Sequence, residues 1–384
     1  MRETFKNIYE VLTAMSKHIL VTGGAGFIGS FIVDKMVELG NEVRIFDNLD
    51  SQVHPNGRPS YLNPKAEFVK GDVAKKDELR KALEDVEIVF HEASAVGVGQ
   101  SMYQISHYTS VNNIGTANLL DILVNGKHNV KKILVAASMS SYGEGLYECQ
   151  NCGIKTPPLR TEEQMAAGKW ELICKCGRQL KPIPTPETKN LDSNSIYALS
   201  KKDQEEMVLM IGKTYGIPAV SLRYFNVFGP RQSLSNPYTG VAAIFMSRIK
   251  NDHRPVVYED GLQTRDFISV HDIVDANISA MKSNSANYES FNVGSGKPQT
   301  IKGIAETLAG MYGKNIKPEV TLKFRKGDVR HCFADMSKIK SKIGWQPRVS
   351  FEGGMKELIE WSRKEESIDK FDDARRELEE RGLV

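Results

Sequence analysis

The sequence predicts an α/β fold in which helices cover both faces of a doubly wound, parallel β-sheet. An apolar run at residues 18–22 breaks into glycines at residues 23–29 and resumes with helical spacing, which is typical of a strand, a tight turn and a helix. From there to residue 137, short apolar strands alternate with helical segments, an order that implies parallel strands joined by crossover helices.

The apolar pattern places each element of this half of the chain. Strands are expected at residues 18–22, 42–46, 67–70, 86–91 and 132–137, and helices at residues 79–83, 108–124 and 197–215. Residues 48–64 are rich in Pro, Gly, Asn and Ser and predict a polar loop. Because ligands of such sheets bind at the carboxyl ends of the strands, the residues directly after each strand are the first candidates for a site.

The glycines after the first strand predict a dinucleotide site. Gly23, Gly26 and Gly29 recur at every third residue, where the backbone must turn sharply, approach a pyrophosphate and let the helix pack on its strand. Asp47 ends the second strand about 20 residues on, where a carboxylate accepts the ribose hydroxyls. No basic residue lies beside Asp47, which favours NAD over NADP. The alternative is a purely structural turn between a strand and a helix.

Further cofactor contacts are expected along the same edge of the sheet. N–H groups in the first helical turn would face the phosphates. Asp72, after the third strand, could accept the adenine amino group or could equally cap the next helix. The small residues after the fourth strand would let the cofactor lie against the backbone. Besides the glycines and Asp47, the expected contacts are Phe27, Ile28, Asn48, Asp72, Val73, Ala93, Asn112, Tyr197 and Lys201.

Composition limits the class of protein. The 384 residues are 40% hydrophobic, which is ample for a large core and a smaller appended part. The net charge is +3 without long basic runs, so we expect no nucleic-acid partner and instead a compact anionic ligand held by a few arginines. No apolar run approaches the roughly 18 residues that span a membrane, and the charged start is no signal peptide. A cytoplasmic protein without membrane contact is expected.

Tyr197 and Lys201 are four residues apart, so on a helix they share one face. A tyrosine hydroxyl has an ordinary pKa near 10, and a neighbouring ammonium favours the phenolate and lowers that pKa. Behind a dinucleotide-binding half, this pair predicts a proton-transfer site. The alternative is an ordinary solvated helix face.

Six motifs together carry a resemblance to the extended short-chain dehydrogenase/reductases, in particular to NAD-dependent epimerases and dehydratases of nucleotide sugars. They lie at residues 22–29, 112–116, 197–201, 222–230, 265–267 and 327–329. The resemblance covers residues 17–363 and implies a Rossmann domain with a smaller C-terminal part that binds the substrate.

The resemblance also implies roles for single residues. Ser138 would be the third catalytic residue and hydrogen-bond the sugar O4, Tyr197 would take or give the O4 proton, and Lys201 would lower the pKa of the tyrosine. NAD would take a hydride from C4 and return it to the other face of a 4-keto sugar. The residues implied around the nucleotide-diphosphate sugar are Ser138, Asn226, Arg265, Arg325 and Asp328. For Arg325, a surface ion pair is the alternative.

One departure from the family pattern reduces the number of reactions that the chain is expected to catalyse. The dehydratases carry Thr-Asp-Glu where this chain has Ser138-Met139-Ser140, and a methionine cannot transfer the protons that the loss of water requires. A 4-epimerase of the UDP-glucose/galactose or dTDP-L-rhamnose type is therefore expected. The alternatives are a 4-keto-sugar reductase or dehydrogenase and a cofactor-sensing binding protein.

Ser138 and Tyr197 are farther apart than in the family, and the extra residues hold a cysteine motif. Its members are Cys149, Cys152, Cys174 and Cys176. Each pair is followed by glycine, which suits a knuckle whose N–H groups face thiolates, and four thiolates make a closed tetrahedral site for structural zinc. A disulfide or redox pair and a metal-free remnant are the alternatives. With residues 143–147, this insert also resembles that of dTDP-L-rhamnose 4-epimerases.

The expected domain organisation follows from these motifs. An N-terminal extension (1–16) precedes an NAD-binding Rossmann domain (17–230), which a zinc-ribbon-like insert (145–190) interrupts; a mainly sugar-nucleotide-binding part (231–363) and a charged C-terminal helix (364–384) follow. The resemblance implies that the two long helices of the Rossmann domain pair across a homodimer.

Overall fold

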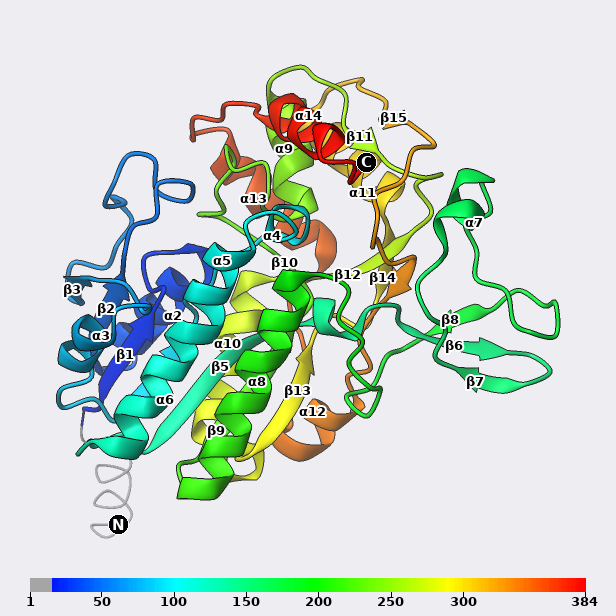
Figure 1. Cartoon of the computed structure of the whole chain (residues 1–384). Coiled ribbons are helices and arrows are strands. Elements are labelled where there is room, and N and C mark those ends of the chain that lie inside the picture. The colour runs from blue at the N-terminus through cyan, green and yellow to red at the C-terminus, as the bar shows by residue number, and fades with distance from the viewer. Residues whose placement is uncertain (1–15) are drawn as a thin grey trace, which may run out of the picture.

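The computed structural model describes residues 16–384, so nearly all of the expected N-terminal extension lies outside the described residues (Figure 1). Seven parallel strands form the main sheet in the order β13-β9-β5-β4-β1-β2-β3. Their bounds are β1 (His18–Thr22), β2 (Glu42–Asp47), β3 (Glu67–Lys70), β4 (Ile88–His91), β5 (Lys132–Ser138), β9 (Ala219–Tyr224) and β13 (Glu289–Val293). The five strands expected from the sequence are confirmed, and the strand order reverses beside β1, where such sheets bind ligands.

Helices cover both faces of this sheet, as predicted. One face packs against α2 (Phe27–Glu38), α10 (Val270–Lys282) and α12 (Ser337–Ile343). The other packs against α3 (Lys76–Ala82), α6 (Gly115–Asn125) and α8 (Ile196–Tyr215), and Figure 1 shows α6 and α8 side by side. The helix expected at residues 108–124 runs without a break from α5 (Ile105–Tyr108) through a wide π-type turn at residues 109–114 into α6, and a short helix, α4 (Val98–Ser101), precedes it.

A smaller second unit has a core of its own. It comprises β10 (Asn226–Phe228), α9 (Val241–Lys250), β11 (Val256–Val257), β12 (Thr264–Ser269), β14 (Pro298–Thr300), α11 (Ile301–Tyr312), β15 (Glu319–Val320), β16 (His331–Cys332) and α13 (Phe351–Ser362). The predicted boundary at residue 230 does not divide the chain cleanly. The chain returns to the main sheet through α10 and β13, because the apolar faces of both elements are buried against it.

The cysteine insert is a separate lobe beside the second unit. It contains a three-stranded antiparallel sheet in the order β7-β6-β8, formed by β6 (Leu146–Cys149), β7 (Gly153–Lys155) and β8 (Lys181–Ile183), with α7 (Glu162–Ala166) between the last two. The expected C-terminal helix is α14 (Phe371–Glu380), which Figure 1 shows close to α9. Among residues 16–384, no helix has the length and apolar character needed to cross a membrane.

Candidate active site

A cavity of about 910 Å³ runs from the carboxyl ends of the main-sheet strands into the second unit. All three predicted catalytic residues, all four predicted substrate residues besides Ser138, and every predicted cofactor residue except Asn112 line it. Residues far apart in the sequence therefore meet in one chamber, and a dinucleotide and a second ligand can lie against each other there.

The turn after β1 is shaped to take a pyrophosphate. Gly23 has a φ of +69°, and a Cβ on it would lie 2.7 Å from the backbone N of Ala93. A Cβ on Gly29 would collide with the carbonyl of Gly23, so the helix packs this closely only with glycine. No side chain caps the start of α2 and no acidic residue occupies its first turn. The N–H groups and dipole there remain available to a phosphate.

The predicted acidic residues lie at the expected ends of their strands. Asp47 accepts hydrogen bonds from the N–H groups of Ala25 (3.0 Å) and Leu49 (2.9 Å), which joins the glycine turn to the end of β2. The carboxylate of Asp72 accepts from the N–H of Ala74 at 2.9 Å, whereas the capping position of α3 belongs to Lys75. The helix-cap interpretation of Asp72 is therefore wrong, and the side chain is at the cavity wall.

Asn112 lies behind the cavity wall rather than in it. Its amide oxygen accepts from the N–H of Ala95 at 2.8 Å and its amide nitrogen donates to Ser200 Oγ at 2.8 Å. The side chain is fully buried in the wide turn before α6. In the described structure, Asn112 thus supports the backbone after β4 and the start of α8 instead of meeting the cavity directly.

The three predicted catalytic residues converge from β5 and α8. Ser138 ends β5, and both the N–H (3.2 Å) and the hydroxyl (2.8 Å) of Ser140 donate to its Oγ. Since these bonds occupy its acceptor sites, the Ser138 hydroxyl proton is available to a ligand oxygen. Ser195 caps α8, which places Tyr197 and Lys201 one turn apart on the face toward the cavity.

The proton affinities of this pair differ from the sequence expectation. Burial raises the pKa of Tyr197, and the nearby Ser138 hydroxyl offsets the rise in part. Burial also lowers the pKa of Lys201 to about 8, and its ammonium donates to Gln204 Oε1 at 2.8 Å. The predicted lowering of the tyrosine pKa is thus wrong for the protein by itself, because the effect of burial outweighs that of the Ser138 hydrogen bond.

The predicted substrate residues other than Ser138 line the part of the cavity formed by the second unit. Arg265 donates to the carbonyls of Val329 (2.7 Å) and Arg330 (3.1 Å), and Arg325 pairs with Asp328 at 2.9 Å. For Arg325, the ion-pair interpretation and the cavity position therefore both hold. The Oδ1 atom of Asn226 is buried and has no hydrogen-bond partner within residues 16–384, which suits a residue that meets a polar ligand.

Sequence reasoning missed two groups of cavity residues. Glu92 directly follows β4 and Tyr224 ends β9, and the tyrosine hydroxyl donates to the Glu92 carboxylate at 3.0 Å. The position of Glu92 directly after a strand was a signal that could have identified it. The second group comes from the C-terminal segment, whose distance in the sequence left no signal. Its cavity residues are Phe371, Ala374, Arg375, Leu378 and Leu383.

The insert brings its cysteines together. The sulfur atoms of Cys149, Cys152, Cys174 and Cys176 all lie within 4.8 Å of one another. The N–H of Cys152 donates to the Cys149 carbonyl at 3.2 Å, and the N–H of Gly177 donates to the Cys174 carbonyl at 2.8 Å. Both cysteine pairs therefore form tight turns whose thiols point to one centre. Cys332 is buried elsewhere, in a separate apolar cluster.

Two family models match the chain. The NAD dependent epimerase/dehydratase family matches residues 19–173, and the GDP-mannose 4,6 dehydratase model matches residues 177–358. Among relatives, a dTDP-L-rhamnose 4-epimerase of Burkholderia thailandensis is 36% identical over 91% of this chain and 96% of its own. A putative UDP-glucose 4-epimerase of Methanocaldococcus jannaschii is 33% identical over 90% and 98%.

Solved structures agree with these relatives. The UDP-glucose 4-epimerase of Thermotoga maritima with UDP-glucose is 32% identical, with a TM-score of 0.75 over 90% of this chain and 99% of that one. The Thermus thermophilus UDP-glucose 4-epimerase in complex with NAD is 29% identical, with a TM-score of 0.71 over 90% and 99%. With the glycine turn and the Ser138, Tyr197 and Lys201 arrangement in place, the chain belongs to the NAD-dependent epimerase/dehydratase family.

Proposed function

We propose that this protein is an NAD-dependent 4-epimerase of nucleoside-diphosphate sugars that acts through a transient 4-keto sugar. One observation carries the proposal: the glycine turn, the three catalytic candidates and the arginines of the second unit all open into one cavity. The proposal assigns NAD binding mainly to residues 17–230 and sugar-nucleotide binding mainly to residues 231–363. The relatives act on UDP-sugars or on dTDP-L-rhamnose by name, and these two types are the candidate substrates.

The chain's own residues perform the proton chemistry at O4. Tyr197 removes the O4 proton during oxidation and returns it after the sugar has turned over. Ser138 donates a hydrogen bond to the same oxygen and orients it. When bound against the glycine turn, NAD would supply a hydride acceptor and donor at C4, and its positive nicotinamide ring would add to the field that favours a phenolate. Lys201, one turn along the same face of α8, would add a second positive charge.

The second unit holds the other end of the substrate. Arg265 and Arg325 present guanidinium groups to the diphosphate, for which a planar fork is well suited. Met139 lies buried at the cavity wall between Ser138 and Ser140. Because a thioether neither gives nor takes a proton, the cavity supports inversion at C4 rather than the loss of water.

The test is incubation of the purified protein with UDP-glucose, UDP-galactose and dTDP-L-rhamnose without added NAD. Catalytic inversion at C4, with the NAD that copurifies, supports the epimerase. Conversion that stops at one equivalent of cofactor indicates the reductase or dehydrogenase alternative. NAD binding without conversion of any of the three substrates contradicts the epimerase proposal and favours a cofactor-sensing protein.

For the insert, we propose a closed zinc site with four thiolate ligands, in a zinc-ribbon-like lobe. The mutual distances of the four sulfur atoms support one shared centre over two separate pairs. N–H groups of Asn151 and Cys152 face the sulfur of Cys149 and favour its thiolate form. With four cysteines the coordination is complete, so the metal would stabilise the lobe rather than take part in the reaction.

A homodimer through α8 and the neighbouring helices is also part of the proposal. Leu199 and Met210 share one face of α8, and their exposed fractions are 45% and 64%. An exposed apolar stripe of this kind favours burial against a second copy. Sedimentation of the wild type as a dimer and of Met210→Glu as a monomer is expected, and a wild type that sediments as a monomer contradicts this part.

A further inference from the structure

The loop between β15 and β16 carries Arg325 and Asp328 but has no strand or helix of its own. Three side chains hold three consecutive carbonyls of this loop. Asn194 donates to the carbonyl of Gly327, Arg160 to that of Asp328 (3.0 Å), and Arg265 to that of Val329 (2.7 Å). Asn194 and Arg265 line the cavity themselves, whereas Arg160 reaches the loop from behind, out of the cysteine insert.

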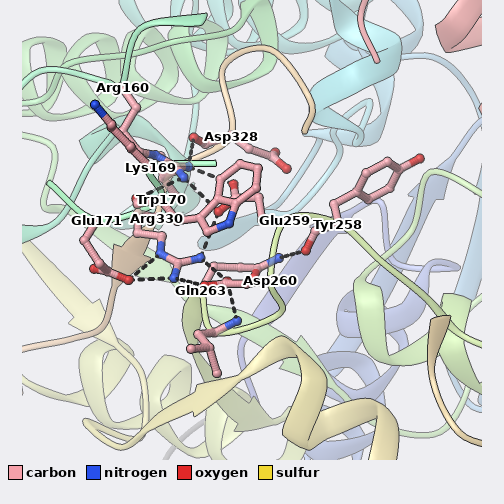
Figure 2. A network of polar contacts seen from close by, with 12 residues as sticks. Arg160, Lys169, Trp170, Glu171, Tyr258, Glu259, Asp260, Gln263, Asp328 and Arg330 are labelled. Atoms are coloured by element: carbon pink, nitrogen blue, oxygen red, sulfur yellow. Dashed lines mark hydrogen bonds and ion pairs between the residues drawn. The ribbon is translucent and has the colours of Figure 1, made fainter. Parts of the chain in front are cut away.

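Arg160 is itself held rigidly. Its two terminal nitrogens donate to the two carboxylate oxygens of Glu259, each at 2.8 Å, and its side chain is fully buried. Figure 2 shows the Arg160 guanidinium between Glu259 and the backbone of Asp328. A bidentate pair of this kind fixes the direction of the remaining N–H groups. The donor to the loop is therefore pre-oriented.

Arg330 joins the same network from the end of the loop. It shares Glu259 with Arg160 (2.9 Å), pairs with Asp260 (2.7 Å) and pairs with Glu171 of the insert (2.6 Å), as Figure 2 shows. Glu259 keeps Arg330 as a partner when Arg160 is replaced. Glu144 is also buried and lies 3.9 Å from Arg160 Nε, so a substitution of Arg160 must keep the positive charge. A lysine at this position can therefore test the role of Arg160 without the large cost of an unpaired buried charge.

The cysteine cluster supports this network through packing. Tyr147 and Leu172 pack against Cys149 and Cys174 in one small core. The hydroxyl of Tyr147 donates to Glu144 at 2.8 Å, and Glu144 accepts from the backbone N–H of Arg330 at 2.6 Å. A continuous set of contacts therefore leads from the cysteines to the loop between β15 and β16.

We propose that Arg160 is a positioning residue for substrate binding, through which the insert holds the Asp328 loop and thereby aims Arg325 at the diphosphate. The inference rests on the proposed function. It gives the insert a part in recognition of the nucleotide diphosphate, while the NAD site and the groups at the sugar O4 are left to the Rossmann domain.

The test compares Arg160→Lys with the wild type, both loaded with NAD. A lysine keeps the charge beside Glu259 but replaces the planar guanidinium fork by one nitrogen on a flexible stem, so the bidentate pair that orients the donor to the Asp328 carbonyl is lost. Backbone amides of residues 325–330 should exchange hydrogen faster in the variant. Its Kd for UDP or dTDP, the probes used, should rise about tenfold, while NAD content and kcat at saturating substrate remain at the wild-type values.

The matched control is Glu162→Gln, which removes the exposed ion pair of the insert with Lys326 at 3.2 Å. Exposed ion pairs contribute little to stability, so hydrogen exchange at residues 325–330 and the Kd for UDP or dTDP should be unchanged. Wild-type exchange at residues 325–330 in Arg160→Lys overturns the inference. Faster exchange with unchanged Kd overturns the link to recognition. A wild type that binds neither UDP nor dTDP contradicts the proposed function instead, and the exchange result still decides whether Arg160 holds the loop.

Discussion

The hydroxyl of Tyr224 donates a hydrogen bond to the carboxylate of Glu92, 3.0 Å away, at the wall of the cavity. Asn277 donates in turn to the tyrosine oxygen at 2.7 Å. Burial raises the pKa of Glu92 to about 7, and the Tyr224 hydrogen bond and the Lys201 charge offset only part of the rise. The cavity thus contains a carboxyl group that titrates close to neutral pH.

This titration makes stability depend on pH. A carboxyl whose pKa is raised in the folded protein contributes stability below its unfolded pKa, and this contribution is lost as pH rises through about 7. Glu92→Gln, which cannot ionise, should therefore gain in melting temperature relative to the wild type between about pH 4.5 and 7. The corresponding difference in the free energy of unfolding should grow by at most about 1.4 kcal/mol per pH unit. A difference in melting temperature that is flat over this range would contradict the assignment.

Tyr197→Phe should abolish proton transfer at O4 and spare the cofactor. Loss of a general acid or base costs about 10²- to 10⁴-fold in turnover, and we expect a fall in kcat of that order. NAD content should remain at the wild-type level, because the glycine turn is unchanged. Tyr215→Phe makes the same change at the far end of α8 and should retain full activity. Near wild-type turnover in Tyr197→Phe would remove this residue from the mechanism.

Cys149→Ser should lose the metal of the insert. We expect about one zinc per chain in the wild type and well under half of that in the variant, measured by elemental analysis after dialysis. Cys332→Ala is the control, since this thiol is buried away from the cluster. Less than a tenth of a zinc per chain in carefully prepared wild type would count against a metal site.

Leu378→Ala should weaken substrate binding from the C-terminal helix. Leu378 lines the cavity and lies close enough to Gly99 that a Cβ on the glycine would be 3.2 Å from its side chain. Loss of this apolar wall should raise the KM for the sugar nucleotide about tenfold, with little change in kcat. Ile368→Ala, an exposed position before α14, should leave KM unchanged. An unaltered KM in Leu378→Ala would show that α14 does not shape the substrate site.

Local features of the chain predicted most of the fold and the cofactor half of the cavity. A glycine turn, a strand end and a tyrosine four residues before a lysine are each set by backbone geometry within a few residues. The four cysteines were also recognisable, since tight turns bring each pair together. The residues of the substrate half could be predicted mainly from the family resemblance, because they come from separate loops.

The sequence by itself determined the parallel sheet, the dinucleotide turn and the candidates for proton transfer, because periodicity and turn chemistry act over short stretches of chain. Only the tertiary structure decided the pKa of Tyr197, the place of Asn112 behind the wall and the approach of α14. It also decided the bond of Arg160 to Glu259, 99 residues away, and to Asp328, 168 residues away. Burial and long-range pairing depend on how whole elements pack, and no short pattern in the chain encodes them.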